Sequence, residues 1–104
     1  MATKNTENKT SKVLVVDDNE QNLELLLAYL EDVDCKVLSA TGGQQALDIT
    51  IQEMPDLLLL DVMMPKMSGF EVCRRLKNDP KTSNIPVIMV TALNELGDIE
   101  RAID

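Results

Sequence analysis

Four short apolar runs recur along the chain, and polar residues or prolines bound each of them. They occupy residues 12–16, 36–40, 57–60 and 87–90. Short continuous apolar runs, without a regular alternation of polar positions, are typical of strands buried on both faces of a sheet. The pattern therefore predicts four strands of a largely buried sheet.

The segments between these runs carry apolar residues at helical spacing. Leu23, Leu26, Leu27 and Leu30 lie three or four positions apart, and Asn19 stands where an N-cap is expected. Two further helices are predicted to open with capping boxes, at Thr41–Gln44 and Ser68–Glu71. The first of these helices carries Ala46, Leu47 and Ile51, and the second is expected to bury Phe70, Cys73 and Leu76. A last predicted helix carries Leu96, Ile99 and Ile103.

Strand and helix thus alternate four times, which indicates an α/β fold with a parallel sheet and helices on both faces. With 104 residues the chain is long enough for one small domain. Residues 1–11 are polar and are expected to form a flexible N-terminal tail. The domain proper is expected over residues 12–104.

Composition excludes several classes of function. The net charge of −8 argues against direct binding of nucleic acid or of an anionic membrane surface. The chain has no histidine, which excludes Ser-His-Asp and Cys-His mechanisms. It shows neither a secretion signal nor an apolar run of about 18 residues, so a cytoplasmic location is expected. Cys35 and Cys73 are expected to be buried free thiols.

Polar residues follow the predicted strands where a parallel sheet binds its ligands, outside the carboxyl ends of the strands. Asp17 and Asp18 follow the first strand, Asp61 the third and Thr91 the fourth. Three carboxylates in one pocket repel each other, and a hard divalent cation relieves that repulsion. Mg²⁺ fits, because it binds through a few carboxylates together with water and phosphate oxygens.

A carboxylate can act as a nucleophile towards a phosphoryl group. Asp61 is the candidate for that role, and the hydroxyl of Thr91 could bond to the new phosphoryl oxygens. Taken singly, each residue has a plainer interpretation: Asp17 and Asp18 as acidic residues at a helix start, Asp61 as the first residue of a turn and Thr91 as a helix cap. Their joint placement on strand ends favours a metal and phosphoryl site.

Three motifs in order, VLVVDD, LLLLDVMMPKMSGFEV and IPVIMVTA, resemble the receiver domain of bacterial two-component response regulators. The resemblance implies a flavodoxin-like, doubly wound parallel sheet. It implies that Asp61 is the phosphoacceptor, that Asp18 binds Mg²⁺ directly and that Asp17 acts mainly through water. It also implies that Met63 gives its backbone carbonyl to the metal and that Thr91 is the switch hydroxyl.

The same resemblance implies further roles and a partner. Ala92 would be the small residue that leaves room for entry to the site, and Pro65 and Gly69 would shape the loop after the acceptor. The phosphodonor would be a sensor histidine kinase or a phosphotransfer protein. Receivers also carry a fifth strand, a lysine at its end and a fifth helix, and these positions would fall beyond Asp104.

The chain is therefore expected to be a (βα)4 fragment of the (βα)5 receiver fold, impaired in switching, with an open edge at its fourth strand. That edge and the last helix would favour a homodimer or segment exchange. Three functions remain open at this point: a phosphorylation-dependent switch without turnover of its own, a phosphate-independent interaction module, and a phosphohydrolase with an aspartate nucleophile. The last would need a second aspartate where the chain has Met63.

Overall fold

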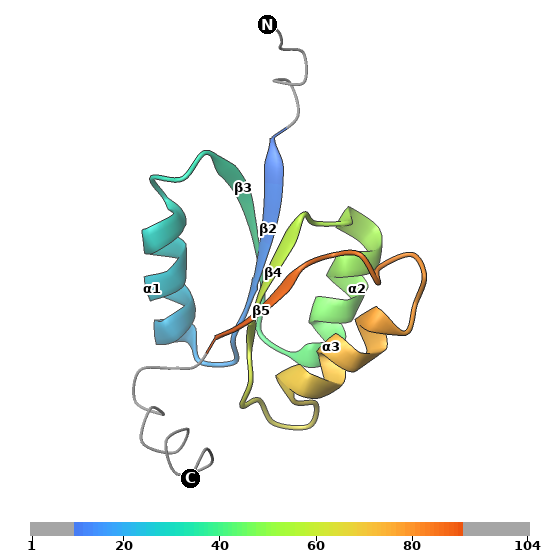
Figure 1. Ribbon diagram of the computed structural model, residues 1–104. Coiled ribbons are helices and arrows are strands. Elements are labelled where there is room, and N and C mark those ends of the chain that lie inside the picture. Colours follow the sequence, from blue (N-terminus) through green and yellow to red (C-terminus); the bar gives the residue numbers. More distant parts are fainter. Residues whose placement is uncertain (1–9, 91–104) are drawn as a thin grey trace, which may run out of the picture.

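The computed structural model describes residues 10–90, and every structural statement below concerns that part of the chain. Strands and helices alternate along it, as predicted (Figure 1). The elements are β2 (Ser11–Val16), α1 (Glu20–Leu30), β3 (Cys35–Ala40), α2 (Gly43–Glu53), β4 (Leu57–Asp61), α3 (Gly69–Lys77) and β5 (Val87–Val90). Of the predicted tail, the structure describes Thr10 and Ser11, and Ser11 already belongs to β2.

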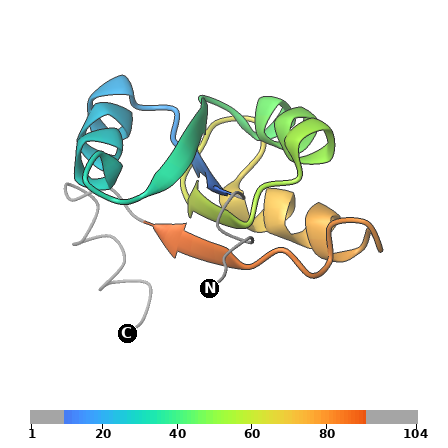
Figure 2. The ribbon, with the colours of Figure 1, turned by 90° about the horizontal axis from the view of Figure 1, so that it is seen from above.

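All four strands run parallel, in the order β3-β2-β4-β5. Helix α1 covers one face of this sheet, while α2 and α3 cover the other (Figures 1 and 2). The predicted doubly wound parallel sheet is confirmed. The order places β2 and β4 side by side in the middle of the sheet, so their carboxyl ends are neighbours.

Alternate residues of β2 serve the two faces of the sheet, as the pleat of a strand requires. Leu14 and Val16 belong to the larger apolar core, between the sheet and helices α2 and α3. Val13 and Val15 pack with Leu23 of α1 in a second core on the opposite face. Burial on both faces explains why the strands read as continuous apolar runs.

The predicted N-cap of α1 is confirmed. The side-chain oxygen of Asn19 accepts hydrogen bonds from the backbone amides of Gln21 at 2.9 Å and Asn22 at 3.1 Å. These bonds satisfy two of the amides that a helix start leaves without an intrahelical partner. The cap fixes the point where the chain leaves the end of β2 and turns into α1.

The capping box predicted for α2 at Thr41–Gln44 is wrong by one residue. Gly42 occupies the N-cap and offers no side-chain bond. Gln45 instead reaches back, and its Oε1 atom accepts from the backbone amide of Thr41 at 2.9 Å and from its hydroxyl at 3.2 Å. Because Gly42 and Gly43 have no side chain, the sequence is compatible with an N-cap at either Thr41 or Gly42.

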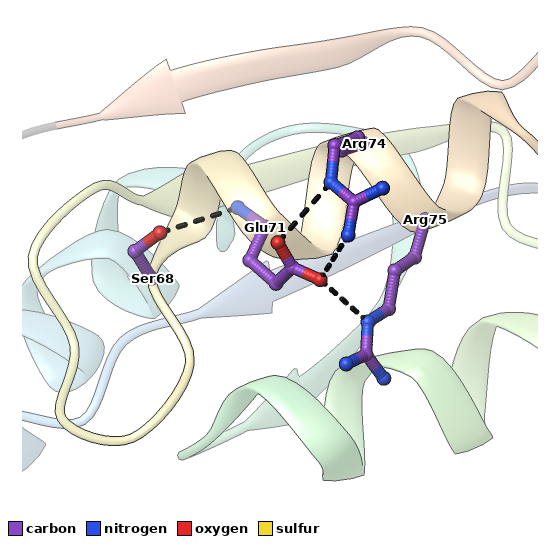
Figure 3. Close-up of polar contacts among 4 residues, drawn as sticks. All are labelled: Ser68, Glu71, Arg74 and Arg75. Carbon is purple, nitrogen blue, oxygen red and sulfur yellow. Dashed lines mark hydrogen bonds and ion pairs between the residues drawn. The ribbon is translucent and has the colours of Figure 1, made fainter.

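One half of the box predicted for α3 forms (Figure 3). Ser68 Oγ accepts a hydrogen bond from the amide of Glu71 over 3.2 Å. The Glu71 carboxylate does not complete the box, because it binds Arg74 at 2.6 Å and Arg75 at 2.8 Å. Both guanidinium groups lie on the same side of the helix as Glu71, and charged partners outcompete a neutral backbone amide.

The predicted burial of Phe70 is wrong, since 63% of this residue is exposed. Gly69, Val72 and Leu76 form the buried face of α3, and Cys73 packs beside them. Phe70 lies outside this buried face. Ile51 of α2 likewise lies outside the core, at 57% exposure. Apolar identity alone did not fix the side of either helix that meets the sheet.

Cys35 and Cys73 are free thiols, as predicted, but the predicted burial is wrong, since both are only half-buried. Among residues 10–90, no helix has the length and apolar character to cross a membrane. The predicted last helix with Leu96, Ile99 and Ile103, together with Thr91 and Ala92, lies outside the described residues.

Candidate functional site

Three aspartates meet at the carboxyl ends of the two central strands. Val16 of β2 pairs in register with Leu60 of β4, so Asp17 and Asp61 follow at the same level of the sheet. Asp18 is the next residue after Asp17. One carboxylate oxygen from each of the three residues lies within 4.8 Å of the other two. Strand register therefore builds the cluster, although Asp18 and Asp61 are far apart in sequence.

The three side chains differ in exposure. Asp17 and Asp61 are each only 2% exposed, whereas Asp18 is exposed to solvent. The backbone amide of Asp17 donates to the carbonyl of Ala40 over 3.1 Å, which ties the start of the site to the end of β3. The cluster thus has two buried carboxylates at its base and an open side lined by Asp18.

The environment of Asp17 disfavours its charge. Burial is the largest influence and raises the pKa of this carboxyl above its ordinary value, and the neighbouring charge of Asp18 raises it further. The hydrogen bond from the Asn19 backbone amide is the largest influence that lowers the pKa of Asp17, and it opposes the shift only in part. A group of buried carboxylates of this kind is stabilised by a hard cation that oxygen ligands can surround.

Each buried aspartate of the site is held by the amide two residues further on. The Asn19 amide donates to Asp17 Oδ1 over 2.9 Å, and the Met63 amide donates to Asp61 Oδ1 over 3.3 Å. This pattern is an Asx turn, in which a side chain takes the place of a backbone acceptor. The two turns direct the chain away from the ends of β2 and β4 and orient both carboxylates.

The loop from β4 to α3 folds back onto the end of β4. The amide of Gly69 donates to the carbonyl of Val62 over 3.0 Å, and the amide of Val62 donates to the carbonyl of Val90 over 3.3 Å. Met63 lies beside Asp61 through its own amide and is 56% exposed. The backbone around Asp61 is therefore bonded to β5 and to the start of α3.

Sequence reasoning missed two parts of this arrangement. It assigned Asn19 as a helix cap but did not foresee that the same residue binds the carboxylate of Asp17. It gave no role to Asn22, whose side chain, in the first turn of α1, lies close enough to the Asp17 carboxyl to lower its pKa. An aspartate directly after a strand is a common start of an Asx turn, and that signal would have predicted the amides of Asn19 and Met63 as partners.

Thr91 lies outside the described residues, but its neighbour is placed. Asp61 pairs in register with Val90, the last residue of β5. The structure thus brings together Asp17, Asp18 and Asp61, with Met63 next to Asp61 and Val90 of β5 paired with Asp61.

Comparison with known proteins places the chain in one family. A sequence profile described as the response regulator receiver domain matches residues 13–104. The chain is 49% identical over 89 residues to the response regulator PleD of Caulobacter vibrioides, covering 86% of this chain and 20% of that protein. It is 40% identical over 92 residues to the polar-differentiation response regulator DivK of Brucella ovis, covering 88% of this chain and 75% of DivK.

Solved structures match in the same way. A putative response regulator from Chloroflexus aurantiacus superposes with a TM-score of 0.78 at 31% identity, covering 86% of this chain and 74% of that one. The N-terminal domain of a response regulator receiver protein from Methanoculleus marisnigri gives a TM-score of 0.75 at 28% identity, with 88% and 92% covered. The chain spans about one fifth of the length of PleD, so it corresponds to one part of that protein.

Proposed function

The chain belongs to the response regulator receiver domain family, and from that premise we propose that Asp61 is the residue that accepts the phosphoryl group. Receiver domains are signalling phosphoacceptors, so the chain has a phosphorylation-dependent signalling role. The observation that carries the finer assignment is the convergence of Asp17, Asp18 and Asp61 at the carboxyl ends of β2 and β4. Asp61 is the member of that cluster on β4, between the other two acids and β5.

In the proposed reaction, a carboxylate oxygen of Asp61 attacks the phosphorus of a phosphohistidine on a sensor histidine kinase or a phosphotransfer protein. The new P–O bond forms as the P–N bond breaks, and the donor imidazole leaves with the electron pair. Little covalent work is left to the protein, since positioning and charge neutralisation dominate phosphoryl transfer. The Met63 amide orients Asp61 for this attack from 3.3 Å.

The residues present fit Mg²⁺, which prefers carboxylate and carbonyl oxygens. We assign Asp18 and Asp61 as direct ligands, Asp17 as a ligand mainly through water, and the backbone carbonyl of Met63 as a further ligand. When bound, the ion would neutralise negative charge on the acids and on the incoming phosphoryl oxygens. Burial of Asp17 and Asp61 at 2% exposure supports this assignment, because two buried carboxylates need a compensating charge.

Thr91 is proposed as the switch hydroxyl, which would bond to the phosphoryl oxygens and change the surface near it and near the following segment. Its support is the pairing of Asp61 with Val90, the residue just before it. Neither this role nor that of Asp61 requires turnover by the chain itself. We therefore propose that the chain is a phosphoacceptor and not an independent enzyme, and that it acts in the cytoplasm.

One observation favours a second function, a phosphate-independent interaction or dimerisation module. In the described residues β5 is an edge strand, and Ile88 on it is 50% exposed. Edge strands with exposed apolar residues favour pairing with another chain. A homodimer, or segment exchange through this edge, is the form that such association would take.

The test of the main proposal is phosphorylation by acetyl phosphate in the presence of Mg²⁺, followed by intact-mass measurement. We expect one phosphoryl adduct on the native chain, none on Asp61→Asn, and an unchanged adduct on Asp34→Asn, a matched change at an exposed aspartate. An adduct that persists in folded Asp61→Asn would rule out Asp61 as the acceptor. Partner binding that is unaffected by Asp61→Asn and by phosphorylation would favour the second function.

A further inference from the structure

Helix α3 begins in direct contact with the backbone of Asp61. The amide of Gly69 donates to the carbonyl of Val62 over 3.0 Å. A Cβ atom added to Gly69 would overlap the carbonyl oxygen of Asp61, and would lie 3.0 Å from the Asp61 carbonyl carbon and 3.1 Å from the Cα of Val62. All three are backbone atoms of the strand end that carries the candidate acceptor, so they cannot move aside as the tip of a side chain can.

The other glycines of the same sheet edge differ from Gly69. A Cβ on Gly42 would meet nothing within 4 Å, whereas one on Gly43 would lie 2.8 Å from the Cβ and Sδ atoms of Met67, so Gly43 is also crowded, but by a side chain. No glycine in the described residues has a positive φ, so the need at Gly69 is one of space and not of backbone conformation. Of these three glycines, only Gly69 would meet backbone atoms of the strand end that carries Asp61.

We propose, on the basis of the function proposed above, that Gly69 is a positioning residue for phosphoryl transfer. Its lack of a side chain lets the start of α3 rest against Asp61, and this contact sets the position of the Asp61 carboxylate relative to Asp17 and Asp18. Asp61 is held from the other side by its register with Val90 of β5. A side chain at position 69 would therefore push the backbone of Asp61 and displace its carboxylate within the acidic cluster.

Helix α3 has little freedom to retreat from such a contact. Val72, three residues after Gly69, is fully buried at 0% exposure and belongs to the core between α3 and the sheet. Ser68 caps the same turn through the amide of Glu71. A methyl group at position 69 therefore moves the end of β4, and a misplacement of about 1 Å at a reacting group can lower a rate by as much as 100-fold.

The experiment compares Gly69→Ala with Gly42→Ala and with Ser68→Ala. We expect Gly69→Ala to weaken Mg²⁺ binding by about tenfold or more by calorimetry, and to slow phosphorylation by acetyl phosphate at saturating Mg²⁺. Gly42→Ala, whose added methyl group meets nothing within 4 Å, is expected to bind Mg²⁺ as the native chain does. Ser68→Ala removes a helix cap and is expected to lower the midpoint of urea unfolding while leaving Mg²⁺ affinity unchanged.

Folded Gly69→Ala with native Mg²⁺ affinity and native phosphorylation rate would overturn the proposal. An equal loss of affinity in Ser68→Ala would also overturn it, because loss of stability would then account for both. A readout independent of phosphorylation is the ¹³C chemical shift of the Asp61 carboxyl in metal-free protein. We expect it to change in Gly69→Ala and not in Gly42→Ala, even if Asp61 proves not to be the acceptor.

If Gly69→Ala does not fold, the native chain still provides a test. Titration with Mg²⁺ and beryllofluoride should shift the amide resonance of Gly69 and leave that of Gly42 in place. A Gly69 amide that does not respond, while the Asp61 carboxyl does, would show that the start of α3 is not coupled to the acceptor.

Discussion

The backbone amide of Asn19 donates to the Oδ1 atom of Asp17 over 2.9 Å, two residues back along the chain. The same spacing recurs between Met63 and Asp61 at the end of β4. Two local turns therefore fix the two buried carboxylates, and the register of β2 with β4 brings the turns together. The site depends on strand pairing for its position and on short-range hydrogen bonds for the orientation of its acids.

Asp17→Asn should stabilise the metal-free protein and weaken its binding of Mg²⁺. Burial and the charge of Asp18 raise the pKa of Asp17, so its ionised form destabilises the folded state at neutral pH in the absence of metal. We expect a higher midpoint of urea unfolding at pH 7 without Mg²⁺. In the native chain, Mg²⁺ at 100 times its dissociation constant should add about 2.7 kcal/mol of stability, and Asp17→Asn should lose most of that gain.

The control for this prediction is Asp34→Asn, which removes one acidic charge at an exposed position outside the cluster. It should alter neither the metal-free midpoint nor the gain with Mg²⁺ by a comparable amount. A metal-free Asp17→Asn protein less stable than the native chain would contradict the prediction, since it would mean that the ionised carboxylate is net stabilising there.

The Glu71 carboxyl should titrate far below its ordinary range. Hydrogen bonds from Arg74 and then Arg75 lower its pKa to about 2, from an ordinary value of 4.5. A carboxyl with a lowered pKa in the folded state contributes stability that is present above the unfolded value. That contribution is lost as the pH falls through the interval from 4.5 to about 2. A ¹³C titration of the side-chain carboxyl measures the pKa directly.

Arg74→Gln combined with Arg75→Gln should return this pKa towards 4.5, and Lys81→Gln should leave it in place. Because the group is at the surface, added salt should also raise it by screening. A Glu71 carboxyl that titrates at its ordinary value in the native chain at low salt would contradict the prediction. It would mean that the two guanidinium contacts do not persist in solution.

Most of the fold could be predicted from the sequence because burial on both faces leaves an unambiguous pattern. The strand end at Val16 and the cap at Asn19 follow from an apolar run that stops at charged residues. The cap of α2 was placed one residue off, since Gly42 and Gly43 give no local preference. Phe70 was assigned to the core because its type is apolar, although only the docking of α3 decides which side of that helix is buried.

The acidic cluster could be predicted as a set of residues but not as a geometry. A parallel sheet brings strand ends to one edge, and that rule alone places Asp17 near Asp61. The contact of Gly69 with the carbonyl of Asp61 could not be predicted in this way, because it depends on how closely α3 approaches β4. Contacts between an element and a backbone atom leave no periodic pattern in the sequence.

Shortening a side chain in the core beneath the site should lower stability far more than shortening one on β5, the edge strand of the sheet in the described residues. Leu58, on central strand β4, is fully buried at 0% exposure, and Leu58→Ala should cost about 2–5 kcal/mol of unfolding free energy. Ile88, on β5, is 50% exposed, and Ile88→Ala should cost clearly less, about 0.5 kcal/mol or below. Urea unfolding followed by circular dichroism measures both. Comparable losses would mean that Ile88 is covered in solution, as pairing through β5 would require.

Thr82 anchors the loop between α3 and β5. Its hydroxyl should contribute more to the free energy of unfolding than is usual for a hydroxyl in a loop. Only 1% of the residue is exposed, and Thr82 Oγ1 donates to the carbonyl of Leu76 over 2.7 Å. Thr82→Val keeps the volume but removes this bond and leaves the Leu76 carbonyl with the longer bond from the Asp79 amide, at 3.3 Å. The expected cost is about 0.5–1.5 kcal/mol of unfolding free energy.

Ser83→Ala, one residue further along, is the matched control for Thr82→Val. The Ser83 hydroxyl is exposed and donates to the carbonyl of Pro80 over a long 3.5 Å, so its removal should change stability by less than about 0.5 kcal/mol. Equal effects of the two substitutions would show that the Thr82 bond is replaced by water in solution. A loss confined to Thr82→Val would show that the buried bond from Thr82 to Leu76 holds this loop in place. The loop leads into β5, whose last residue, Val90, pairs with Asp61.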